Sequence, residues 1–229
     1  MKKMLTSELA SVIVLVAGAV NTAAAGWTVT QLTNNSNFDW NPQVSGQNVA
    51  WQGSDGTDYE IFLYDASTTR QLTNNSYDDY YPQVSGQNVV WQRYDGTDWE
   101  IFLYDGSTTR QLTNNGYTDY NPQVSGQNVA WIGQVGGAGF DTEILLYDGT
   151  TTRQLTTNTY NDYYPQVTGQ NVVWYGYDGS DYEIFLYDGI ATRQLTNNSY
   201  GDYDPQVLEM TLKMILFRLQ SMPVSPSTN

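Results

Sequence analysis

Residues 82–105 read PQVSGQNVVWQRYDGTDWEIFLYD, and nearly the same letters return along most of the chain. The triplet Pro-Gln-Val recurs with spacings of 40, 40, 43 and 40 residues, beginning at Pro42, Pro82, Pro122, Pro165 and Pro205. A period of about 40 residues is typical of repeat architectures, in which one supersecondary unit is copied and stacked on its neighbours. The chain is therefore expected to fold as one repetitive domain.

Each copy is expected to form four short strands, because its short apolar runs are rich in Val, Ile, Tyr and Trp and are bounded by turn formers. In the second copy, the predicted strands are 82–85, 88–92, 100–105 and 108–113. Asp95-Gly96, between the second and third strands, is a strong hairpin signal because both central positions of that turn need positive φ. The unit is therefore predicted to be an antiparallel meander.

Both faces of the third strand are apolar, since alternate residues of a strand point to opposite sides and residues 101–104 are all apolar. A sheet with two apolar faces must be covered on both sides. Four-stranded sheets that recur about every 40 residues and stack around an axis form a β-propeller. We therefore predict an all-β fold, a β-propeller of four-stranded antiparallel blades.

Counting the copies of the repeat predicts four complete blades and a partial fifth. Residues 27–33 match the fourth strand of a copy, and 205–207 begin a copy that does not continue. From residue 208 the repeat stops, and the apolar residues of 208–229 fall at helical spacing, so an irregular or helical tail and an improvised strand pair are both open. With suitable codons, the neighbouring reading frame resumes a repeat-like sequence there. This leads to the hypothesis of a truncated or frameshifted piece of a longer surface protein.

The motifs Pro82–Trp91, Asp95–Asp105 and Gln111–Thr113 together resemble the TolB-like (WD40-like) β-propeller repeat of bacterial and archaeal surface proteins. The resemblance covers residues 27–207 and implies the propeller fold and a role in binding. The turn Ser85-Gly86-Gln87 departs from the Ser-Pro-Asp-Gly turn that is usual in the family. The chain has no room for the α/β domain that precedes the propeller in TolB itself, so we do not extend the role of TolB in the Tol system to this protein.

The N-terminus has the order of a secretory signal peptide. Met1-Lys2-Lys3 is followed by an apolar run over 9–20 and by Ala23-Ala24-Ala25. We expect cleavage after Ala25 and export to the periplasm or the cell surface, which leaves residues 26–207 as the propeller. An uncleaved anchor is the alternative, although the run is short for spanning a bilayer.

The sequence contains no cysteine and no histidine, and it carries a net charge of −15 at pH 7. These absences exclude disulfides, ordinary zinc sites and Ser-His-Asp or Cys-His nucleophile systems. The negative charge repels nucleic acid and anionic lipid, so we expect neither as a partner and no membrane insertion after signal cleavage. A glycosidase that needs only two carboxylates remains open, but every carboxylate recurs in blade after blade, so no catalytic residue is predicted.

Acidic and aromatic residues recur at one predicted end of the blades, where the inter-blade loop meets the hairpin between the second and third strands. The inter-blade loops end in Asp-aromatic-x-Pro and supply Asp39, Trp40, Asp79, Tyr80, Asp119, Tyr120, Asp162, Tyr163, Asp202 and Tyr203. The hairpins supply Asp58, Tyr59, Asp98, Trp99, Asp181 and Tyr182. Such a ring of carboxylates and flat side chains is suited to Ca²⁺, a sugar or a basic peptide. The structural alternative is that the aspartates accept backbone N–H bonds in turns and the aromatics pack on the next blade.

The sequence therefore predicts a non-catalytic exported propeller that serves as a scaffold for a protein or a glycan, without a required cofactor and with Ca²⁺ as the candidate ion. A second hypothesis is a lectin-like propeller with one weak carbohydrate site per blade. A third is a carboxylate-dependent glycoside-active enzyme. Because the copies are nearly identical, strands can also exchange between chains, which predicts a homo-oligomer.

Overall fold

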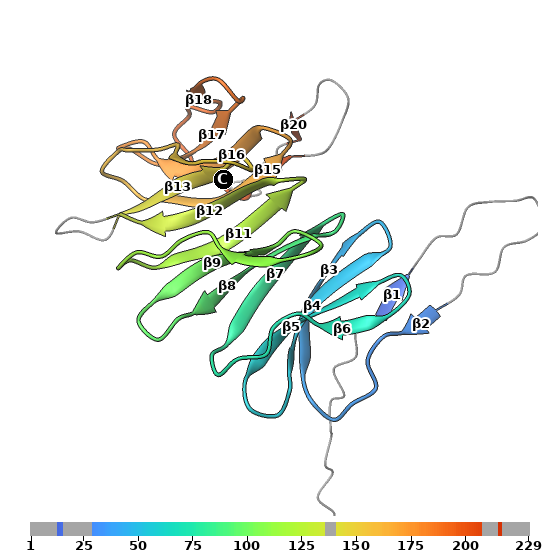
Figure 1. Cartoon of the computed structure of the whole chain (residues 1–229). Coiled ribbons are helices and arrows are strands. Elements are labelled where there is room, and N and C mark those ends of the chain that lie inside the picture. Colours follow the sequence, from blue (N-terminus) through green and yellow to red (C-terminus); the bar gives the residue numbers. More distant parts are fainter. Residues whose placement is uncertain (1–12, 16–28, 136–140, 208–214, 217–229) are drawn as a thin grey trace, which may run out of the picture. The chain divides into compact units, whose positions relative to one another are not determined.

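The computed structural model of the protein describes residues 13–15, 29–135, 141–207 and 215–216. Every regular element in this part of the chain is a β-strand (Figure 1). Within the same residues, no helix is long and apolar enough to cross a membrane. The predicted all-β class is therefore confirmed.

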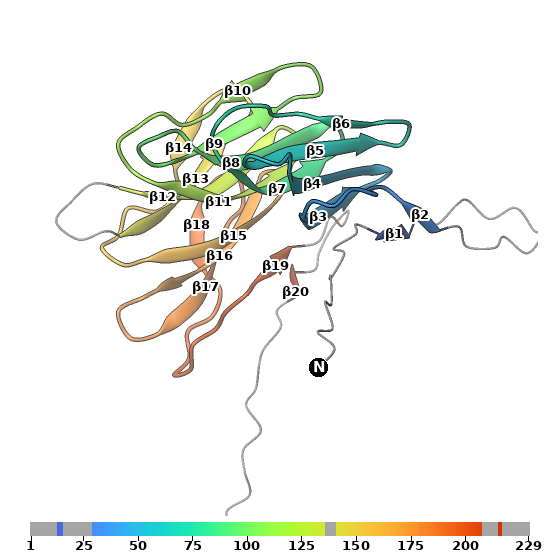
Figure 2. The same ribbon diagram turned by 90° about the horizontal axis from the view of Figure 1, so that it is seen from below.

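The chain divides into two compact units, and unit 1 covers residues 1–116. Its first sheet consists of β3 (Asp39–Ser45), β4 (Asn48–Ser54), β5 (Tyr59–Asp65) and β6 (Thr69–Gln71). Its second sheet consists of β7 (Asp79–Ser85), β8 (Asn88–Tyr94), β9 (Trp99–Tyr104) and β10 (Thr109–Gln111). In both sheets, neighbouring strands are antiparallel and follow chain order. The two sheets contact each other through β7, and they lie side by side in both views (Figures 1 and 2).

Unit 2, residues 117–229, repeats this arrangement. Its first sheet consists of β11 (Asp119–Ser125), β12 (Asn128–Gln134), β13 (Thr142–Tyr147) and β14 (Thr152–Gln154). Its second sheet consists of β15 (Asp162–Thr168), β16 (Asn171–Tyr177), β17 (Tyr182–Tyr187) and β18 (Thr192–Gln194). The four sheets are the four predicted blades, and we number them in chain order.

Two short strand pairs accompany the blades. β1 (Ile13–Leu15) pairs with β2 (Val29–Gln31), and β19 (Gln206–Val207) pairs with β20 (Ile215–Leu216). β1 falls in the predicted signal peptide, whose other residues lie outside the described residues. β20 falls in the predicted tail and belongs to a strand pair. The other tail residues, on which the helical alternative also depends, lie outside the described part.

β2 and Leu32 after it correspond to a fourth blade strand and the leucine that follows it, since Val29–Gln31 align with Thr69–Gln71 of β6. Leu32 packs against Val49 and Trp51 of blade 1, as Leu72 of blade 1 packs against the core that contains Trp91 of blade 2. This packing agrees with the match between residues 27–33 and the fourth strand of the repeat.

The first strand of each blade begins earlier than predicted, because it continues through a β-bulge. In blade 2, β7 begins at Asp79 rather than at Pro82, and its pairing with β8 shifts register between Tyr80 and Gln83. Tyr81, inside this bulge, has a φ of 55°. The residue before the proline has the same left-handed backbone in the other copies, at Asn41, Asn121, Tyr164 and Asp204. Bulges insert an unpaired residue and bend the strand, so the strand passes through the proline instead of starting at it.

The core of each unit lies between its two blades. In unit 1, blade 1 contributes Ile61 and Leu63, and blade 2 contributes Trp91 and Phe102. Burying one tryptophan removes on the order of 200 Å² from water, which contributes about 5 kcal/mol before entropy costs. The prediction that each blade has two apolar faces is confirmed, because both sides of these sheets supply core residues.

Candidate binding site at the hairpin end of the blades

Because neighbouring strands run antiparallel, the connections between them alternate between the two ends of each blade. We call one of these ends the hairpin end; it holds the turn between the second and third strands and the loop that connects to the next blade. The N–H of Tyr59, after the first hairpin, donates to Asp78 Oδ1 of the next inter-blade loop at 3.0 Å. In unit 2, the N–H of Asp202 donates to the carbonyl oxygen of Tyr182 at 2.6 Å. The structure thus places hairpin and inter-blade residues together.

Four inter-blade aspartates lie inside the blades, as the first residues of β3, β7, β11 and β15, and are buried. Each carboxylate accepts a hydrogen bond from an indole N–H, in the pairs Asp39 with Trp51, Asp79 with Trp91, Asp119 with Trp131 and Asp162 with Trp174. Asp162 also accepts from Asn158 Nδ2 at 2.8 Å, and burial raises its pKa. Side-chain indoles and amides donate to these carboxylates, and the Arg93 guanidinium also donates to Asp79 at 2.8 Å, in place of the backbone groups that the structural alternative assumed. The fifth aspartate, Asp202, is only half-buried and accepts from Asn198 Nδ2 at 2.6 Å.

Buried glutamates, which the sequence pattern did not single out, lie beside these aspartates. Glu60 on β5 is fully buried, and its Oε1 accepts the N–H of Asn75 at 2.7 Å. Asn75 Nδ2 in turn donates to Asp79 Oδ2 at 2.7 Å, so the network joins blade 1 to blade 2. Burial raises the pKa of Glu60 to about 7, and nearby Asp79 contributes. Burial likewise raises the pKa of Glu143 in blade 3 to about 7.

The hairpin aspartates form small carboxylate groups. One oxygen from each of Asp95, Asp98 and Glu100 lies within 4.8 Å of the others, and the groups Asp55, Asp58, Glu60 and Asp178, Asp181, Glu183 are arranged in the same way. Oxygen atoms are the ligands that Ca²⁺ prefers, but it takes six to eight of them. Asp95 Oδ1 already accepts two hydrogen bonds within the turn, from the N–H of Thr97 at 2.9 Å and from the hydroxyl of Thr97 at 2.6 Å. One of the oxygens of these three carboxylates already accepts turn hydrogen bonds, so the group supplies too few oxygens to complete the coordination shell of Ca²⁺.

The recurrent aromatic residues form a continuous contact series in blade 2. Ring centroids are 6.3 Å apart for Tyr77 and Tyr94 and 5.7 Å for Tyr94 and Trp99. They are 5.6 Å apart for Trp99 and Tyr80 and 6.1 Å for Tyr80 and Tyr81. We call these five residues the aromatic string of unit 1. Burial raises the pKa of Tyr80 to about 12, with Asp78 adding to the effect.

Blade 4 carries the same string. Tyr160 contacts Tyr177 at 5.2 Å, Tyr177 contacts Tyr182 at 5.5 Å, and Tyr182 contacts Tyr163 at 6.3 Å. Tyr175 then joins Tyr163 to Tyr164, at 5.7 Å from each. These six tyrosines are the aromatic string of unit 2. Tyr203 extends it, because its ring lies 5.5 Å from that of Tyr182.

Tyr81 and Tyr164 were missed by the sequence analysis. Both have left-handed backbones, with φ of 55° and 49°, and about half of each residue is exposed, 49% and 51%. A bulky residue at positive φ is uncommon and costs free energy. A signal was present in the sequence, since the residue before the proline alternates between asparagine and tyrosine in the four complete blades.

Other predicted site residues are placed differently. Trp40 is exposed at the start of blade 1 and contacts Phe38, with ring centroids 6.4 Å apart. Tyr120 of blade 3 is half-buried and packs against the core of unit 2. Tyr59 contacts Tyr80 of blade 2 at 5.3 Å. The predicted residues are therefore brought together in blades 2 and 4 more fully than in blades 1 and 3.

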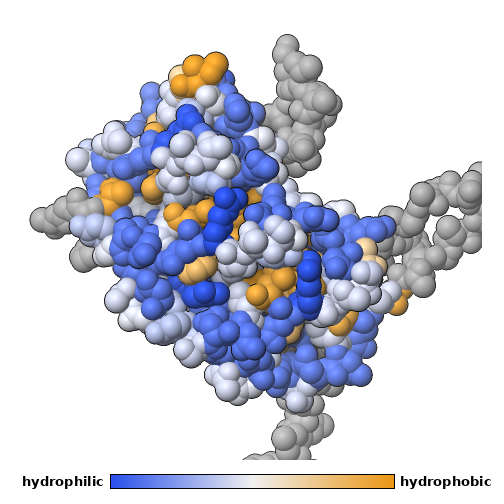
Figure 3. All heavy atoms as spheres, viewed as in Figure 1, coloured by the Kyte–Doolittle hydropathy of each residue, from blue (hydrophilic) through white to orange (hydrophobic). Residues whose placement is uncertain are grey.

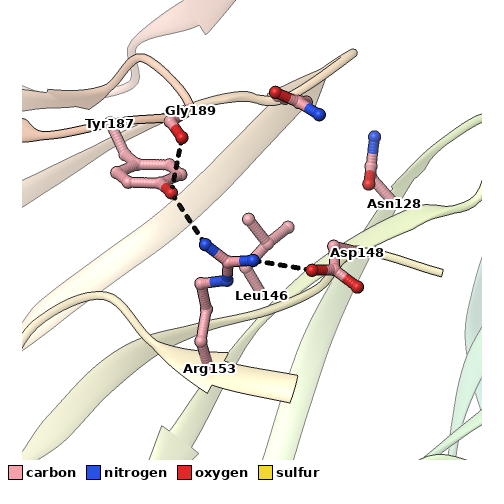
Figure 4. Close-up of a pocket in the computed structure, with 7 residues that line it drawn as sticks. Asn128, Leu146, Asp148, Arg153, Tyr187 and Gly189 are labelled. Atoms are coloured by element: carbon pink, nitrogen blue, oxygen red, sulfur yellow. Dashed lines mark hydrogen bonds and ion pairs between the residues drawn. The ribbon is translucent and has the colours of Figure 1, made fainter. Parts of the chain in front are cut away.

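A small cavity of about 60 Å³ lies at the opposite end of unit 2 (Figure 4). Arg153 extends along it and is bound on both sides, with Nη1 3.1 Å from the Tyr187 hydroxyl and Nη2 2.6 Å from Asp148 Oδ2. The Tyr187 hydroxyl donates to the carbonyl oxygen of Gly189 at 2.9 Å. The cavity has room for a few water molecules. Arg153 is held by Asp148 and Tyr187, which are themselves lining residues.

The face of the molecule in Figure 3 is largely hydrophilic, with apolar residues in separate small groups. The arginines on the fourth strands, Arg70, Arg110, Arg153 and Arg193, are exposed. Arg193 pairs with Asp188 at 3.2 Å on the surface, as Arg153 pairs with Asp148. Exposed ion pairs of this kind contribute little to stability. The arginines therefore belong to the outer edge of the blades.

No protein-family model and no curated protein sequence matches the chain. Among solved structures, it is similar to a putative TolB from Agrobacterium tumefaciens, with a TM-score of 0.56 and 18% identity over 75% of this chain and 70% of that chain. TolB from Acinetobacter baumannii matches with a TM-score of 0.51 and 19% identity over 72% of this chain and 45% of that chain. A puromycin-hydrolyzing peptidase from Mycobacterium tuberculosis matches with a TM-score of 0.55 and 14% identity over 73% of this chain and 30% of that chain.

The chain therefore spans less than half of the Acinetobacter protein and less than a third of the peptidase. At these identities the likeness shows the fold, which is that of TolB-like β-propellers. The resemblance that the repeat motifs predicted is confirmed at this level.

Proposed function

We propose that this protein is an exported, non-catalytic β-propeller that binds a protein or a glycan outside the cytoplasm through the hairpin end of its blades. The observation that carries the proposal is the pair of aromatic strings, in which partly exposed rings are held by neighbouring rings and by the strands beneath them. Rigid aromatic side chains supply contact area at a low entropy cost, which makes them effective binding anchors.

The buried position of the titratable groups supports a non-catalytic role. Glu60 and Glu143 have a pKa near neutrality, as a general acid or base would need. Both are buried, however, and Glu60 is hydrogen-bonded to the backbone of the next loop, so a substrate has no access to them. The likeness to a puromycin-hydrolyzing peptidase, at 14% identity over 30% of that chain, shows the fold alone.

Export is proposed from the signal-like N-terminus. The periplasm and the cell surface are the two compartments that fit. The net charge of −15 argues against nucleic acid and anionic membranes as partners. No cofactor is required in this proposal.

The test is to screen the full chain on a glycan array and a peptide array and then to compare variants on the best ligand. The double variant Trp99→Ala with Tyr182→Ala is expected to bind at least about tenfold more weakly, because it removes one anchor from each string. Ile190→Ala is the control, since Ile190 is 91% exposed and lies in the turn at the opposite end of blade 4. Equal binding by the double variant, with an unchanged circular dichroism spectrum, would refute the hairpin end as the contact face.

The same screen separates the alternatives. A lectin-like role is favoured by the repeated exposed rings, and binding confined to glycans would establish it. Release of free sugar, abolished by a single Asp→Asn change, would replace both binding proposals with a glycoside-active enzyme.

A further inference from the structure

The four blades alternate between two kinds. Before the proline, the first and third blades have Asn41 and Asn121, and the second and fourth have Tyr81 and Tyr164. In the second strand, the first and third have Ala50 and Ala130 before tryptophan, and the second and fourth have Val90 and Val173. Each compact unit holds one blade of each kind. The chain is thus two copies of a two-blade unit, as well as four copies of one blade.

The complete aromatic string belongs to the second kind of blade. Tyr94 and Tyr177 are the second rings of the two strings, and the equivalent residues of the first and third blades are Ser54 and Gln134. The string therefore occurs once in each unit, with the same order of ring contacts. Two blades of the same chain show that this backbone does not require the rings.

The tyrosine at the end of each string is kept at a conformational cost. Asparagine visits the left-handed region readily, whereas tyrosine does so at a penalty. Asn41 and Asn121 adopt the same backbone at the equivalent positions, with φ of 50° and 52°. Strain of this kind points to a use for the side chain, and here the side chain is a half-exposed ring.

Carboxylates lie close to both strings. In unit 1, Asp78 helps to raise the pKa of Tyr80, and Asp95 and Asp98 are direct sequence neighbours of Tyr94 and Trp99. In unit 2, Asp204 helps to raise the pKa of Tyr175, and Asp178 and Asp181 are direct sequence neighbours of Tyr177 and Tyr182. Arg93, which precedes Tyr94 in the sequence, is turned inward, with Nε 2.8 Å from the buried Asp79 and the guanidinium 4.1 Å over the ring of Phe102. Its equivalent in unit 2 is Gly176. Both strings therefore offer ring faces in a negative field, and a cation is attracted by each of these two features.

We propose that the hairpin end of each unit holds one site for a cationic side chain of a basic peptide, with Tyr81 in unit 1 and Tyr164 in unit 2 as the exposed aromatic wall. The site would take the ammonium of lysine or the guanidinium of arginine over its rings, and the chain would be bivalent for such a partner. This inference rests on the proposed function and names its ligand class.

The test is calorimetric titration of the full chain with hexa-lysine at low salt, using Tyr81→Asn, Tyr164→Asn and the double variant. These changes leave the net charge intact, so general attraction between the acidic protein and the peptide is the same in all. We expect two sites per unmodified chain, one in either single variant, and at least about tenfold weaker binding in the double variant. The thermal midpoint is expected to stay equal or rise, because asparagine relieves the left-handed strain.

Tyr117→Asn is the matched control, since it removes a ring that is 47% exposed from a blade of the first kind. It should bind like the unmodified chain, and a loss equal to that of the double variant would overturn the proposal. Full binding by the double variant would overturn it as well. Maltohexaose is the second probe: if it binds at these tyrosines and hexa-lysine does not bind, the cationic ligand is wrong and the proposed binding function stands. Failure of hexa-lysine alone overturns only this inference, because the arrays test the function with other ligands.

Discussion

Four aspartates are buried in this protein while keeping their hydrogen bonds. A carboxylate taken out of water is costly unless donors compensate it. Asp162 obtains them from the Trp174 indole at 2.8 Å and from Asn158 at 2.8 Å. The indole is itself fully buried, so one residue supplies both apolar area and a donor. The pair therefore joins the first strand of a blade to its second strand.

Changing Trp174 to phenylalanine is expected to lower the free energy of unfolding by about 1–3 kcal/mol, because it keeps most of the apolar ring but leaves the buried carboxylate short of a donor. The measurement is urea denaturation followed by circular dichroism. Trp40→Phe is the control, because Trp40 is 51% exposed. A loss for Trp174→Phe no larger than that for Trp40→Phe would contradict the role of the bond.

Sequence reasoning succeeded at residues whose conformation is decided locally. The Asp-Gly pairs mark the hairpins correctly, and Gly56, Gly96 and Gly179 have φ of 109–111°. The two-residue turn is wrong in detail, because the preceding aspartates do not have the positive φ that it needs. The loop has four residues, and in blade 2 the N–H of Asp95 donates to the carbonyl oxygen of Asp98 at 3.0 Å. Sequence reasoning did not reveal that Asp79 is buried, because a polar residue near a turn is interpreted as exposed unless its partner is known. That partner is a tryptophan twelve residues away, and the constant spacing of the pair was the available signal.

At the scale of strands and loops, one glutamate is buried on each third strand, and in blade 1 it connects three elements. Glu60 of β5 accepts from Asn75 in the following loop, and Asn75 donates to Asp79 at the start of β7. A residue in one blade thus orients the first strand of the next. The sequence predicted the third strand but not this role, since a glutamate within an apolar strand gives no indication of which loop will cover it.

Stability is expected to fall as the pH rises from about 5 to 8. The folded-state pKa of Glu60 and of Glu143 is about 7, above the ordinary value of 4.5, so the folded protein holds protons that the unfolded chain releases. The contribution is complete below pH 4.5 and is lost as the pH passes through 7, on the order of 1–3 kcal/mol per group. Thermal unfolding across this range measures it.

The double variant Glu60→Gln with Glu143→Gln should remove most of that slope, because glutamine does not titrate. Titration of the turn aspartates does not contribute to the slope between pH 5 and 8. Their pKa is lowered, to about 2 for Asp178 by the Ser180 hydroxyl and N–H, so their contribution is lost only in more acidic solution. A slope that survives in the double variant would assign the pH dependence to other groups.

Calcium at millimolar concentration is expected to leave the thermal midpoint within about 1 °C. The hairpins of blades 1, 2 and 4 each offer three carboxylates, and one of their oxygens already accepts the hydrogen bonds of the turn. Magnesium at the same concentration controls for ionic strength. A rise of several degrees that is specific to calcium would show that the hairpins complete a metal site.

The first strand of each blade is longer than the sequence predicts. Proline was taken as the start of that strand, since it cannot donate to the sheet. The structure continues the strand back to Asp79 through the bulge at Tyr81. A left-handed tyrosine is disfavoured by its own propensity, so only the surrounding sheet imposes it.

At the scale of the whole molecule, the repeat itself governs behaviour. The blade count and the antiparallel order of strands followed from the sequence, because the copies are nearly verbatim and each carries its own turn signals. The two-blade period is a weaker signal in the sequence, because few positions such as Asn41 and Tyr81 carry it. The aromatic ring contacts, which recur in each unit, show this period more clearly.

Near-identical blades also allow a strand of one chain to pair with a blade of another. We expect a dimer fraction that grows with concentration in the high micromolar range, because exchanged strands would make the same contacts as the native ones. Size-exclusion chromatography with light scattering on a dilution series measures it. A single monomeric mass at every concentration would contradict strand exchange.

The two aromatic strings differ in one residue that affects their light emission. Trp99 lies within the string of unit 1, 5.6 Å from Tyr80 and 5.7 Å from Tyr94, whereas the string of unit 2 consists of tyrosines alone. Unit 2 has its own indoles, Trp131 and Trp174, but both are fully buried in the blades. Trp99 is the indole that stands within a string, so a ligand that covers the string of unit 1 changes indole emission directly, and a ligand on unit 2 does so only through its tyrosines.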